Sequence, residues 1–170
     1  MSLPSSVKIV EVGPRDGLQN EKAHVPTDVK VKLINKLVDA GLSVIEAGSF
    51  VSPKWVPQMA DTRDVFKRAV VGADVSFPVL VPTLKGLEAA IEVGAKEIAG
   101  FAAASETFSQ KNTNCSIKES LDRQRRVCEE AIRSGLRVRG YISVVLGCPY
   151  EGDIDPRVVA DVAQQLYQMG

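Results

Sequence analysis

Short apolar runs alternate with longer amphipathic stretches along the chain, and a glycine follows most of the amphipathic stretches. This alternation predicts strands that are each followed by a helix, with glycine ending the helix because it adopts the left-handed conformation without steric cost. The strands are nearly continuous in apolar character, which is typical of a parallel sheet covered by helices. Pro78 weakens the third strand because proline removes one ladder donor. The predicted strands are residues 7–12, 44–47, 75–81, 98–102 and 138–145.

The predicted helices have recognisable starts and inward faces. Ser116 and Glu119 have the spacing of a capping box, in which each side chain satisfies a free backbone donor of the first turn. Asp155 followed by Pro156 is typical of a cap and a first helical residue. Thr27 is the predicted cap of the first helix, and the other predicted starts are Asp61 or Thr62, and Lys85. The predicted inward side chains are Ile34, Leu37 and Val38 in the first helix, Leu121, Val127, Cys128, Ala131 and Ile132 in the fourth, and Val159, Val162, Ala163 and Leu166 in the fifth.

Five strand–helix units in this order predict an α/β fold with parallel strands. A closed TIM barrel has eight such units and roughly 250 residues, whereas an open doubly wound sheet needs fewer. The doubly wound fold carries a G-x-G-x-x-G fingerprint after its first strand, and residues 13–17 read GPRDG instead. We therefore expect the first five βα units of a (β/α)8 TIM barrel, with residues 1–170 as the N-terminal part of a single catalytic domain.

Charge and composition exclude several functional classes. Lys and Arg total 21, and Asp and Glu total 21, so the chain has no net field that would attract nucleic acid or an anionic membrane. The basic cluster at residues 123–126 is interpreted as a solvated helix face. No apolar run approaches the roughly 20 residues that span a bilayer, and residues 1–6 have no signal-peptide core.

The cysteines and the single histidine narrow the chemistry further. Cys115, Cys128 and Cys148 are widely spaced and odd in number, which indicates reduced thiols in a reducing compartment rather than a disulfide framework. We expect a cytoplasmic protein, with the mitochondrial matrix as the alternative. His24 lies in a polar loop, and one histidine is too few for a metal site built on imidazole.

The strongest candidate site follows the first predicted strand. Arg15, Asp16 and Gln19 place a cation, a carboxylate and an amide within five residues, on a turn rich in glycine and proline. Glu46 lies in the neighbouring second strand. Because strand ends of parallel folds form the active face, and because a buried carboxylate needs a partner, Arg15 is the expected partner of Glu46. The alternative is a structural salt bridge at the rim of the barrel.

Asp16 is also a candidate metal ligand. Mg²⁺ and Mn²⁺ are hard cations that prefer oxygen ligands. The alternative is an aspartate that caps its own turn, which is common next to glycine. The predicted pairing of Arg15 with Glu46 favours the metal-site interpretation, because it places the carboxylate of Asp16 beside a polar pocket.

Three loops carry weaker candidates. The loop at residues 49–59 is long and contains Trp55, which either contributes to a site or covers the barrel mouth. The loop at residues 103–115 contains Lys111, which either meets a phosphate or carboxylate or is simply solvated. Cys148 follows the fifth predicted strand, and a structural thiol is favoured because no activating base or cation is predictable beside it.

Three stretches of the chain together resemble the 3-hydroxy-3-methylglutaryl-CoA lyase family. Residues 10–21 read VEVGPRDGLQNE, residues 49–58 read SFVSPKWVPQ, and residues 147–152 read GCPYEG. The first stretch alone resembles the wider superfamily of metal-dependent barrel lyases, aldol-type synthases and biotin-linked carboxyltransferases. The resemblance runs along essentially the whole chain and implies a TIM barrel.

The resemblance implies an enzyme that cleaves hydroxymethylglutaryl-CoA to acetoacetate and acetyl-CoA with a divalent metal, in leucine breakdown and ketone-body formation. By resemblance, Arg15 stabilises enolate charge on the thioester oxygen and Glu46 supports Arg15. Asp16 ligates the metal, and Gln19 lines the substrate pocket. The family's His-x-His pair, asparagine ligand and lid cysteine are expected beyond Gly170, so we expect the 170 residues alone to be inactive.

Two positions depart from the family pattern, and two other functions remain open. Thr83 stands where asparagine is common, which we expect to alter the pocket mouth slightly, and Val144 stands where cysteine is common. One alternative function is a related acyl-CoA aldolase or synthase of the same superfamily. The other is a noncatalytic half-barrel that serves in assembly, because open sheet edges invite pairing. For the full-length protein we expect an acyl-CoA substrate, a homodimer, and neither nucleic acid nor membrane as a partner.

Overall fold

The computed structural model describes residues 3–69 and 74–170. The chain divides into two compact units, Met1–Val79 and Leu80–Gly170. Within the described ranges, four strands are hydrogen-bonded to their neighbours in chain order, as an open row rather than a closed ring. The second strand begins in the first unit and continues into the second. The strands are β1 (Gly48–Ser49), β2 (Val79–Leu80), β3 (Glu97–Ala103) and β4 (Arg137–Ser143).

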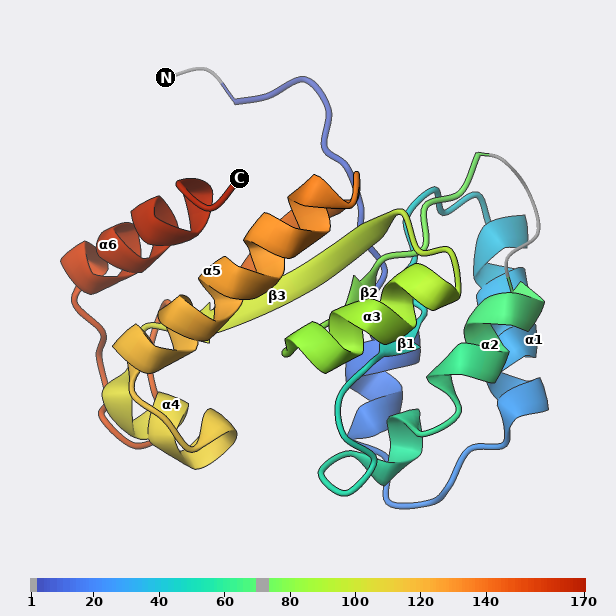
Figure 1. Ribbon diagram of the computed structural model, residues 1–170, viewed down its shortest axis with the longest axis horizontal. Helices are drawn as coiled ribbons and strands as arrows, with labels where there is room; N and C mark the ends of the chain where they lie inside the picture. The colour runs from blue at the N-terminus through green and yellow to red at the C-terminus, as the bar shows by residue number, and fades with distance from the viewer. Residues whose placement is uncertain (1–2, 70–73) are drawn as a thin grey trace. The chain divides into compact units, whose positions relative to one another are not determined.

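Two helices of the Met1–Val79 unit pack against each other (Figure 1). Each has one apolar face, as periodicity predicts: Ile34 of the first helix is buried, and so are Val65 and Phe66 of the second. Leu37 and Val38, predicted to face inward, are half-buried. The elements of this unit that precede β2 are the π-helical turn η1 (Gly13–Gly17), α1 (Thr27–Asp39), β1, the 3₁₀ turn η2 (Pro57–Met59) and α2 (Thr62–Ala69).

The predicted strand at residues 7–12 is wrong in extent. In the described part of the chain it is a single parallel bridge between Glu11 and Ile45, with Glu46 N donating to Glu11 O (2.8 Å). Val7, earlier in the predicted strand, is 77% exposed. An apolar run becomes a strand only where a neighbouring backbone completes the ladder, and the periodicity of the run does not reveal that neighbour.

The second predicted strand is shifted, because β1 (Gly48–Ser49) lies just beyond residues 44–47, and the third is shortened to Val79–Leu80. A parallel bridge between Val44 and Ser76 precedes β1 and β2. Pro78 lies directly before β2, where its carbonyl accepts a bond from the neighbouring backbone (3.0 Å). The proline is therefore tolerated, because it contributes an acceptor to the ladder although it lacks a donor.

The start of α1 corrects another prediction. Thr27 is the first helical residue and not the cap; the cap position is Pro26, which makes no side-chain cap bond. The Thr27 hydroxyl instead donates to Asp61 Oδ2 (2.7 Å), ahead of the second helix. That helix starts at Thr62, as predicted. Thr27 thus serves a tertiary contact that the local sequence does not reveal.

Two seven-residue strands form the centre of the Leu80–Gly170 unit. β3 and β4 pair in parallel from Glu97 opposite Arg137 to Ala103 opposite Ser143, which confirms the fourth and fifth predicted strands with their ends shifted. The 17-residue helix α5 (Ile117–Arg133) packs along β3 (Figure 1). The other helices of this unit are α3 (Leu84–Glu92), α4 (Glu106–Thr113) and α6 (Pro156–Tyr167).

These four helices start at side-chain caps. The predicted capping box is confirmed: Glu119 N donates to Ser116 Oγ (3.2 Å), and Ser116 N donates to Glu119 Oε2 (2.9 Å). The bonds from Ser116 hold the pKa of the Glu119 carboxyl below its ordinary value. Asp155 caps α6 as predicted, because its Oδ1 accepts a hydrogen bond from Arg157 N (2.9 Å). Thr83 and Ser105 cap α3 and α4 in the same manner.

Helix α4 corrects the loop predicted for residues 103–115. The helix is short and largely polar, so it has no apolar stripe for periodicity to detect. Its signals are local instead. Ser105 Oγ accepts from Phe108 N (3.0 Å) at the start, and Asn114 takes the left-handed conformation (φ 52°) at the end.

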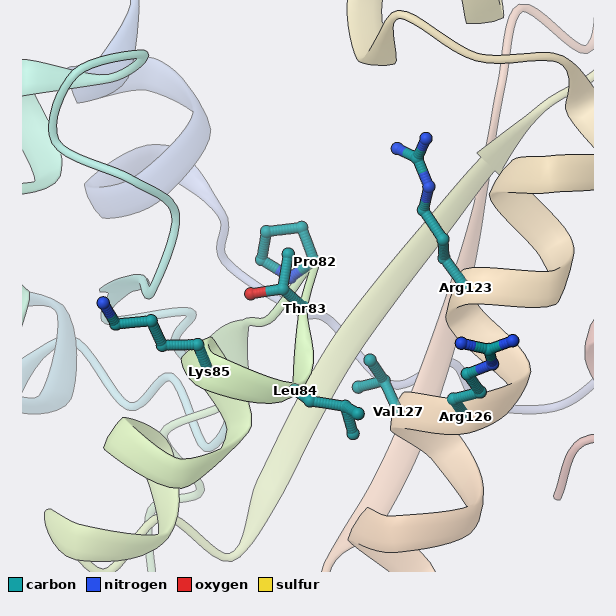
Figure 2. A pocket seen from close by; sticks show the side chains of 7 residues that line it. All are labelled: Pro82, Thr83, Leu84, Lys85, Arg123, Arg126 and Val127. Atoms are coloured by element: carbon teal, nitrogen blue, oxygen red, sulfur yellow. The ribbon is translucent and has the colours of Figure 1, made fainter.

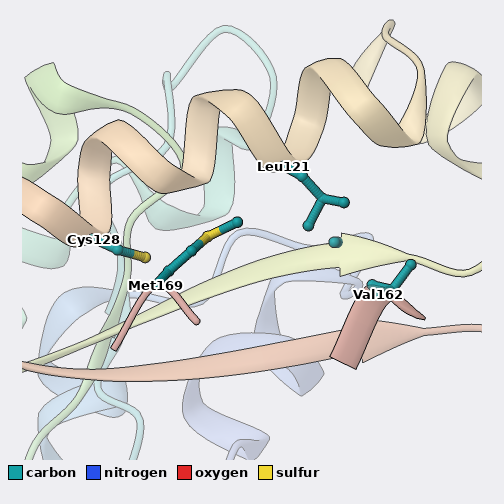
Figure 3. Packing of buried hydrophobic residues seen from close by; sticks show 5 residues of the cluster. Leu121, Cys128, Val162 and Met169 are labelled. Atoms are coloured by element: carbon teal, nitrogen blue, oxygen red, sulfur yellow. The ribbon is translucent and has the colours of Figure 1, made fainter. Parts of the chain in front are cut away.

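The core of the Leu80–Gly170 unit is apolar. Leu121 and Cys128 of α5 lie against Val162 of α6 and Met169 (Figure 3). Burial raises the pKa of the Cys128 thiol above its ordinary value, which is typical of an inert core cysteine. Among the described residues, no helix combines the length and the apolar character that crossing a membrane requires.

Two side chains predicted to face this core are exposed. Ile132 is 46% exposed, and Ala163 is exposed as well. Each directly follows a buried residue, Ala131 or Val162. Neighbouring helical positions point about 100° apart at 3.6 residues per turn, so a shift of one position moves a side chain off the buried stripe.

Candidate functional site

The candidate site of the Met1–Val79 unit is built on the turn η1. Arg15 N and Asp16 N both donate to Val12 O (3.0 and 2.7 Å), which closes the turn. Gly13 N donates to Glu11 Oε1 (2.6 Å), and a Cβ at Gly13 would lie 2.7 Å from that same oxygen. A side chain at position 13 would therefore displace the Glu11 carboxylate from its hydrogen bond with the backbone of the turn.

The turn directs Arg15 onto a buried carboxylate. Arg15 Nε donates to Glu46 Oε1, and the two side chains are 10% and 0% exposed. Glu46 N also donates to the backbone of Glu11 (2.8 Å), so the turn and the strand are joined at the same point. The predicted pairing of Arg15 with Glu46 is confirmed. Removing either partner would break a buried ion pair, which destabilises a fold.

Asp16 and Gln19 complete the group on the solvent side. Arg15 Nη1 contacts Asp16 Oδ1 at 2.7 Å, and the Asp16 side chain is 54% exposed. Gln19 Nε2 donates to the same oxygen at 3.5 Å, and Asn20 Nδ2 donates to Asp16 O (2.7 Å). The guanidinium of Arg15 therefore bridges a buried carboxylate and an exposed one. All four predicted site residues, including Glu46, come together in one unit.

Asp16 is the member of this group that suits a divalent cation. In the described residues its carboxylate contacts side chains and does not cap its own turn, and its exposure leaves an oxygen open to a hard cation. Within residues 3–69 and 74–170, no three His, Cys, Asp or Glu side chains gather as a metal site. Asp16 therefore fits a cation as one ligand of its shell.

A buried lysine beside the long loop was missed by the sequence analysis. Lys30 is 3% exposed, and its Nζ donates to Asp61 Oδ1 (2.6 Å) and to Gln58 O. Burial raises the pKa of Asp61, but the bonds from Lys30 and Thr27 outweigh it and hold the pKa below its ordinary value. Lys30 lies four residues before the buried Ile34 on α1, and this spacing is the signal that would have found it.

The loop that follows β1 is anchored at several points. Ser49 N donates to Thr62 Oγ1 (3.1 Å), and that hydroxyl donates to Met59 O (2.8 Å). Gln58 Nε2 donates to Glu21 O (2.9 Å), which ties the loop to the segment after η1. Trp55, at the centre of the loop, is 81% exposed. The loop is thus held at its ends, with its tryptophan presented to solvent.

The loop after β4 is fastened to the start of α4. Cys148 is buried, its Sγ lies 3.1 Å from Ser105 Oγ, and it accepts from Tyr150 N (3.4 Å). Burial raises the pKa of this thiol, but the hydrogen bonds from Ser105 and the loop backbone outweigh it and hold the pKa below its ordinary value. Glu151 Oε1 accepts from Thr107 N (2.6 Å). These contacts agree with a structural role for Cys148.

Other predicted candidates have clear surroundings. Lys111 Nζ lies 4.9 Å from the centroid of the Tyr150 ring, a cation–π arrangement. Cys115, Cys128 and Cys148 are all free and buried, which agrees with reduced thiols. Thr83 Oγ1 accepts a hydrogen bond from Gly86 N (3.2 Å), so the hydroxyl of Thr83 caps α3.

Val144, the second departure from the family pattern, directly follows β4. Its φ of 59° lies in the left-handed region, which β-branched side chains rarely adopt. Such a conformation costs on the order of 1–3 kcal/mol and persists only where the surroundings impose it.

A parallel α/β chain whose first turn holds an arginine between two carboxylates fits the metal-dependent barrel lyases as a class. Residues 6–170 match the family model described as HMGL-like, and the chain belongs to that family. Its fold is that of part of a (β/α)8 barrel.

Named relatives specify the class further. The chain is 60% identical to the mitochondrial hydroxymethylglutaryl-CoA lyase of Bos taurus over 99% of its own length and 52% of that protein. It is 59% identical to the 3-hydroxy-3-isohexenylglutaryl-CoA/hydroxy-methylglutaryl-CoA lyase of Pseudomonas aeruginosa, over 100% of its own length and 57% of that protein. The crystal structure of hydroxymethylglutaryl-CoA lyase from Pseudomonas aeruginosa superposes with a TM-score of 0.95 at 59% identity, covering 100% of this chain and 57% of that one. The chain thus spans about half the length of these relatives.

Proposed function

We propose that the complete protein is a carbon–carbon lyase that cleaves 3-hydroxy-3-methylglutaryl-CoA to acetoacetate and acetyl-CoA. The observation that carries this proposal is the guanidinium of Arg15, held between the buried Glu46 and the exposed Asp16. The turn that presents it belongs to the part of the chain that matches the lyase family. A guanidinium held in this way is preorganised toward an oxygen that becomes negative during a reaction.

The reaction creates such an oxygen. The tertiary hydroxyl loses its proton and becomes the ketone of acetoacetate as the carbon–carbon bond breaks. The electron pair of that bond remains on the carbon beside the thioester carbonyl and delocalises onto the carbonyl oxygen as an enolate, which takes up a proton to give acetyl-CoA. Arg15 stabilises that charge, which typically contributes a few kcal/mol per well-placed donor. Glu46 keeps the guanidinium oriented, and their low exposure limits screening by water.

Asp16 and Gln19 are the proposed contacts to a metal and to the substrate. Asp16 is the proposed ligand of Mg²⁺ or Mn²⁺, which when bound polarises the substrate hydroxyl and carboxylate oxygens as a Lewis acid. Gln19 lies beside Asp16 and is the proposed amide contact to the substrate. One carboxylate is a sparse shell for a divalent cation, so we expect the 170 residues alone to lack catalysis.

The wider setting of the activity is part of the same proposal. The 170 residues belong to one catalytic TIM-barrel domain of a homodimer that takes an acyl-CoA substrate, in leucine breakdown and ketone-body formation. The relatives' names support the acyl-CoA class. We propose a cytoplasmic location, with the mitochondrial matrix as the alternative that the bovine relative supports.

The test joins this chain to the remaining part of the Pseudomonas aeruginosa relative, which shares 59% identity over the aligned region. We expect the purified chimera to release acetyl-CoA and acetoacetate from hydroxymethylglutaryl-CoA, and Mg²⁺ or Mn²⁺ to be required. Asp16→Asn should raise the metal concentration needed for half-maximal rate by at least about tenfold, because a neutral amide is a poorer ligand for a hard cation. Asp28→Asn, an exposed aspartate at the start of α1, is the matched control.

Two results would contradict the proposal. A folded chimera without lyase activity at saturating metal would remove the assigned reaction. An Asp16→Asn variant with the metal dependence of the Asp28→Asn control would remove Asp16 from the metal site.

A second candidate is a lyase of the same class that prefers a larger acyl group. The Pseudomonas aeruginosa relative is named for both an isohexenyl and a methyl substrate. A panel of 3-hydroxy-3-alkylglutaryl thioesters separates the candidates. A kcat/KM that rises with alkyl length favours the second, and one that falls favours the first.

A further inference from the structure

A groove lies between the start of α3 and the middle of α5, both within the Leu80–Gly170 unit. Its volume is about 290 Å³, which is near the lower end of the roughly 300–1,000 Å³ of small-molecule sites. Figure 2 shows α3 on one side of the groove and α5 on the other. The lining residues are Pro82, Thr83, Leu84, Lys85, Arg123, Arg126 and Val127.

The charge of the lining is of one sign. Lys85 comes from α3, Arg123 and Arg126 come from α5, and no lining residue is acidic. In the part of the chain that the structure describes, no salt bridge joins Lys85 or Arg126 to a carboxylate. Arg123 makes a long contact from Nη1 to Thr113 O (3.5 Å) and lies near the Glu119 carboxylate, four positions earlier on α5. Glu119 therefore offsets part of the charge of Arg123, and Lys85 and Arg126 keep the potential of the groove positive.

The floor between these cations is apolar. Leu84 and Val127 point toward each other across the groove, with Pro82 above them (Figure 2). Leu84 is 44% exposed and supplies the accessible apolar surface below the charged rim, whereas Val127 is 1% exposed and lies behind it. A ligand with a small apolar body and an anionic head would contact the cations and cover the apolar floor. An inorganic ion alone would leave that apolar floor exposed to water.

The side chains of residues 123–126 on α5 do not all face the groove. Residues 123–126 were predicted to form one solvated face, but Gln124 is buried at 4% and Arg125 lies close enough to Cys128 to influence its thiol. Only Arg123 and Arg126, three positions apart on one helix face, line the groove. Two guanidinium groups on one face favour a planar, multi-oxygen anion, because each can donate two parallel hydrogen bonds.

We propose that this groove binds a small organic anion, a phosphate or carboxylate on a short apolar body. The arginines hold the head, Leu84 and Val127 contact the body, and Lys85 adds long-range attraction. This site lies wholly within the Leu80–Gly170 unit and does not rest on the proposed lyase activity.

Phenyl phosphate and benzoate are the probes, titrated into the ¹⁵N-labelled 170-residue chain and followed by NMR chemical shifts. We expect saturable shifts centred on residues 82–85 and 123–127, with a Kd on the order of 1 mM or tighter. Inorganic phosphate should bind several-fold more weakly, because it leaves the floor uncovered, and benzyl alcohol should not saturate, because it has no charge. The relative affinity of the two organic probes tells which head group is preferred.

Matched variants separate a site from general surface charge. Arg126→Gln should weaken phenyl phosphate binding by about tenfold, a loss typical of one charge-assisted contact. Arg125→Gln removes the same charge one position along α5 and should change the Kd less than twofold. Leu84→Ser should weaken phenyl phosphate but leave inorganic phosphate unchanged.

The proposal is overturned if the two arginine variants lose affinity equally, or if no probe saturates. Unchanged spectra away from the substituted positions show that each variant is folded. Each outcome is read from binding alone, so it is independent of any lyase assay.

Discussion

Two groups of cations, one in each unit of the chain, differ in burial and pairing. In Met1–Val79 the cations Arg15 and Lys30 are buried and joined to carboxylates. In Leu80–Gly170 the core is an apolar cluster, and the cations Arg123 and Arg126 lie at an exposed groove. A buried, paired cation has a fixed direction and destabilises the fold when its partner is lost. An exposed cation contributes little to stability and is available to a ligand.

The largest effect is expected from Glu46→Ala on the isolated chain. It removes the buried partner of Arg15 and leaves the exposed Asp16 as its paired carboxylate, which should cost about 3–5 kcal/mol of unfolding free energy. Urea unfolding measures the loss. Glu21→Gln, an exposed carboxylate in the same unit, should change the unfolding free energy by less than about 0.5 kcal/mol. If Glu46→Ala costs no more than this control, the buried pair does not hold the first unit together.

Leu121→Ala is the corresponding destabilising substitution in the second unit. Leu121 is 3% exposed within the apolar cluster, so the variant loses apolar burial and leaves a cavity, at a cost of about 2–4 kcal/mol. The midpoint in urea reports the loss, which should be independent of pH between 5 and 8 because no charge changes. A pH-dependent penalty in that range would mean that charge also stabilises this core.

Lys30→Met tests the second buried cation. It leaves Asp61 with only Thr27 as a side-chain partner, and because Asp61 keeps some solvent contact we expect a loss of roughly 2–3 kcal/mol, below that of a fully buried pair. The experiment is thermal unfolding at neutral pH, with the exposed Lys32→Met on the same helix as control. Equal penalties for the two lysines would show that burial of Lys30 is immaterial.

The same pair makes a pH prediction. The pKa of Asp61 is lower in the folded chain than its ordinary value of 3.8. Its ionised form therefore stabilises the fold above pH 3.8, and this contribution is lost as the pH falls through the lower, folded-state pKa. Asp61→Asn should unfold with a shallower dependence on pH than the unmodified chain below about pH 4. If the unfolding free energy of Asp61→Asn depends on pH as steeply as that of the unmodified chain, Asp61 does not contribute to the loss of stability in acid.

The smallest stability effect is expected from Arg126→Gln. Its side chain is exposed and has no ion-pair partner in the described residues, so the unfolding free energy should change by less than about 0.5 kcal/mol. Scanning calorimetry measures the change in unfolding free energy. A loss larger than this would show that Arg126 stabilises the fold as the buried cations do, and would contradict the comparison.

The sequence analysis predicted best where one local rule governs the structure. The capping box at Ser116, the two strands that became β3 and β4, and the pairing of Arg15 with Glu46 all follow from spacing, apolar content or the cost of a buried charge. It missed α4, because a short polar helix has no apolar period. It also missed the contact of Lys30 with Asp61, because Lys30 was not assigned to the buried face of α1, where a lysine needs a partner.

The roles of the site residues are a different matter from their positions. The geometry brings Arg15, Asp16, Gln19 and Glu46 together, but their chemical roles come from the resemblance to the lyase family. Geometry alone also permits a structural ion pair. A catalytic guanidinium and a structural ion pair predict different effects of one substitution on the rate of cleavage.

That measurement is the effect of Arg15→Lys on the chimera that completes the barrel. Lysine keeps the positive charge but loses the planar, directed guanidinium, so kcat for hydroxymethylglutaryl-CoA cleavage should fall by at least about 10²–10³-fold, as expected when one oxyanion-stabilising donor is lost. The metal concentration for half-maximal rate should change little. A kcat within tenfold of the parent chimera, in a folded variant, would contradict the account and leave Arg15 as a structural partner of Glu46.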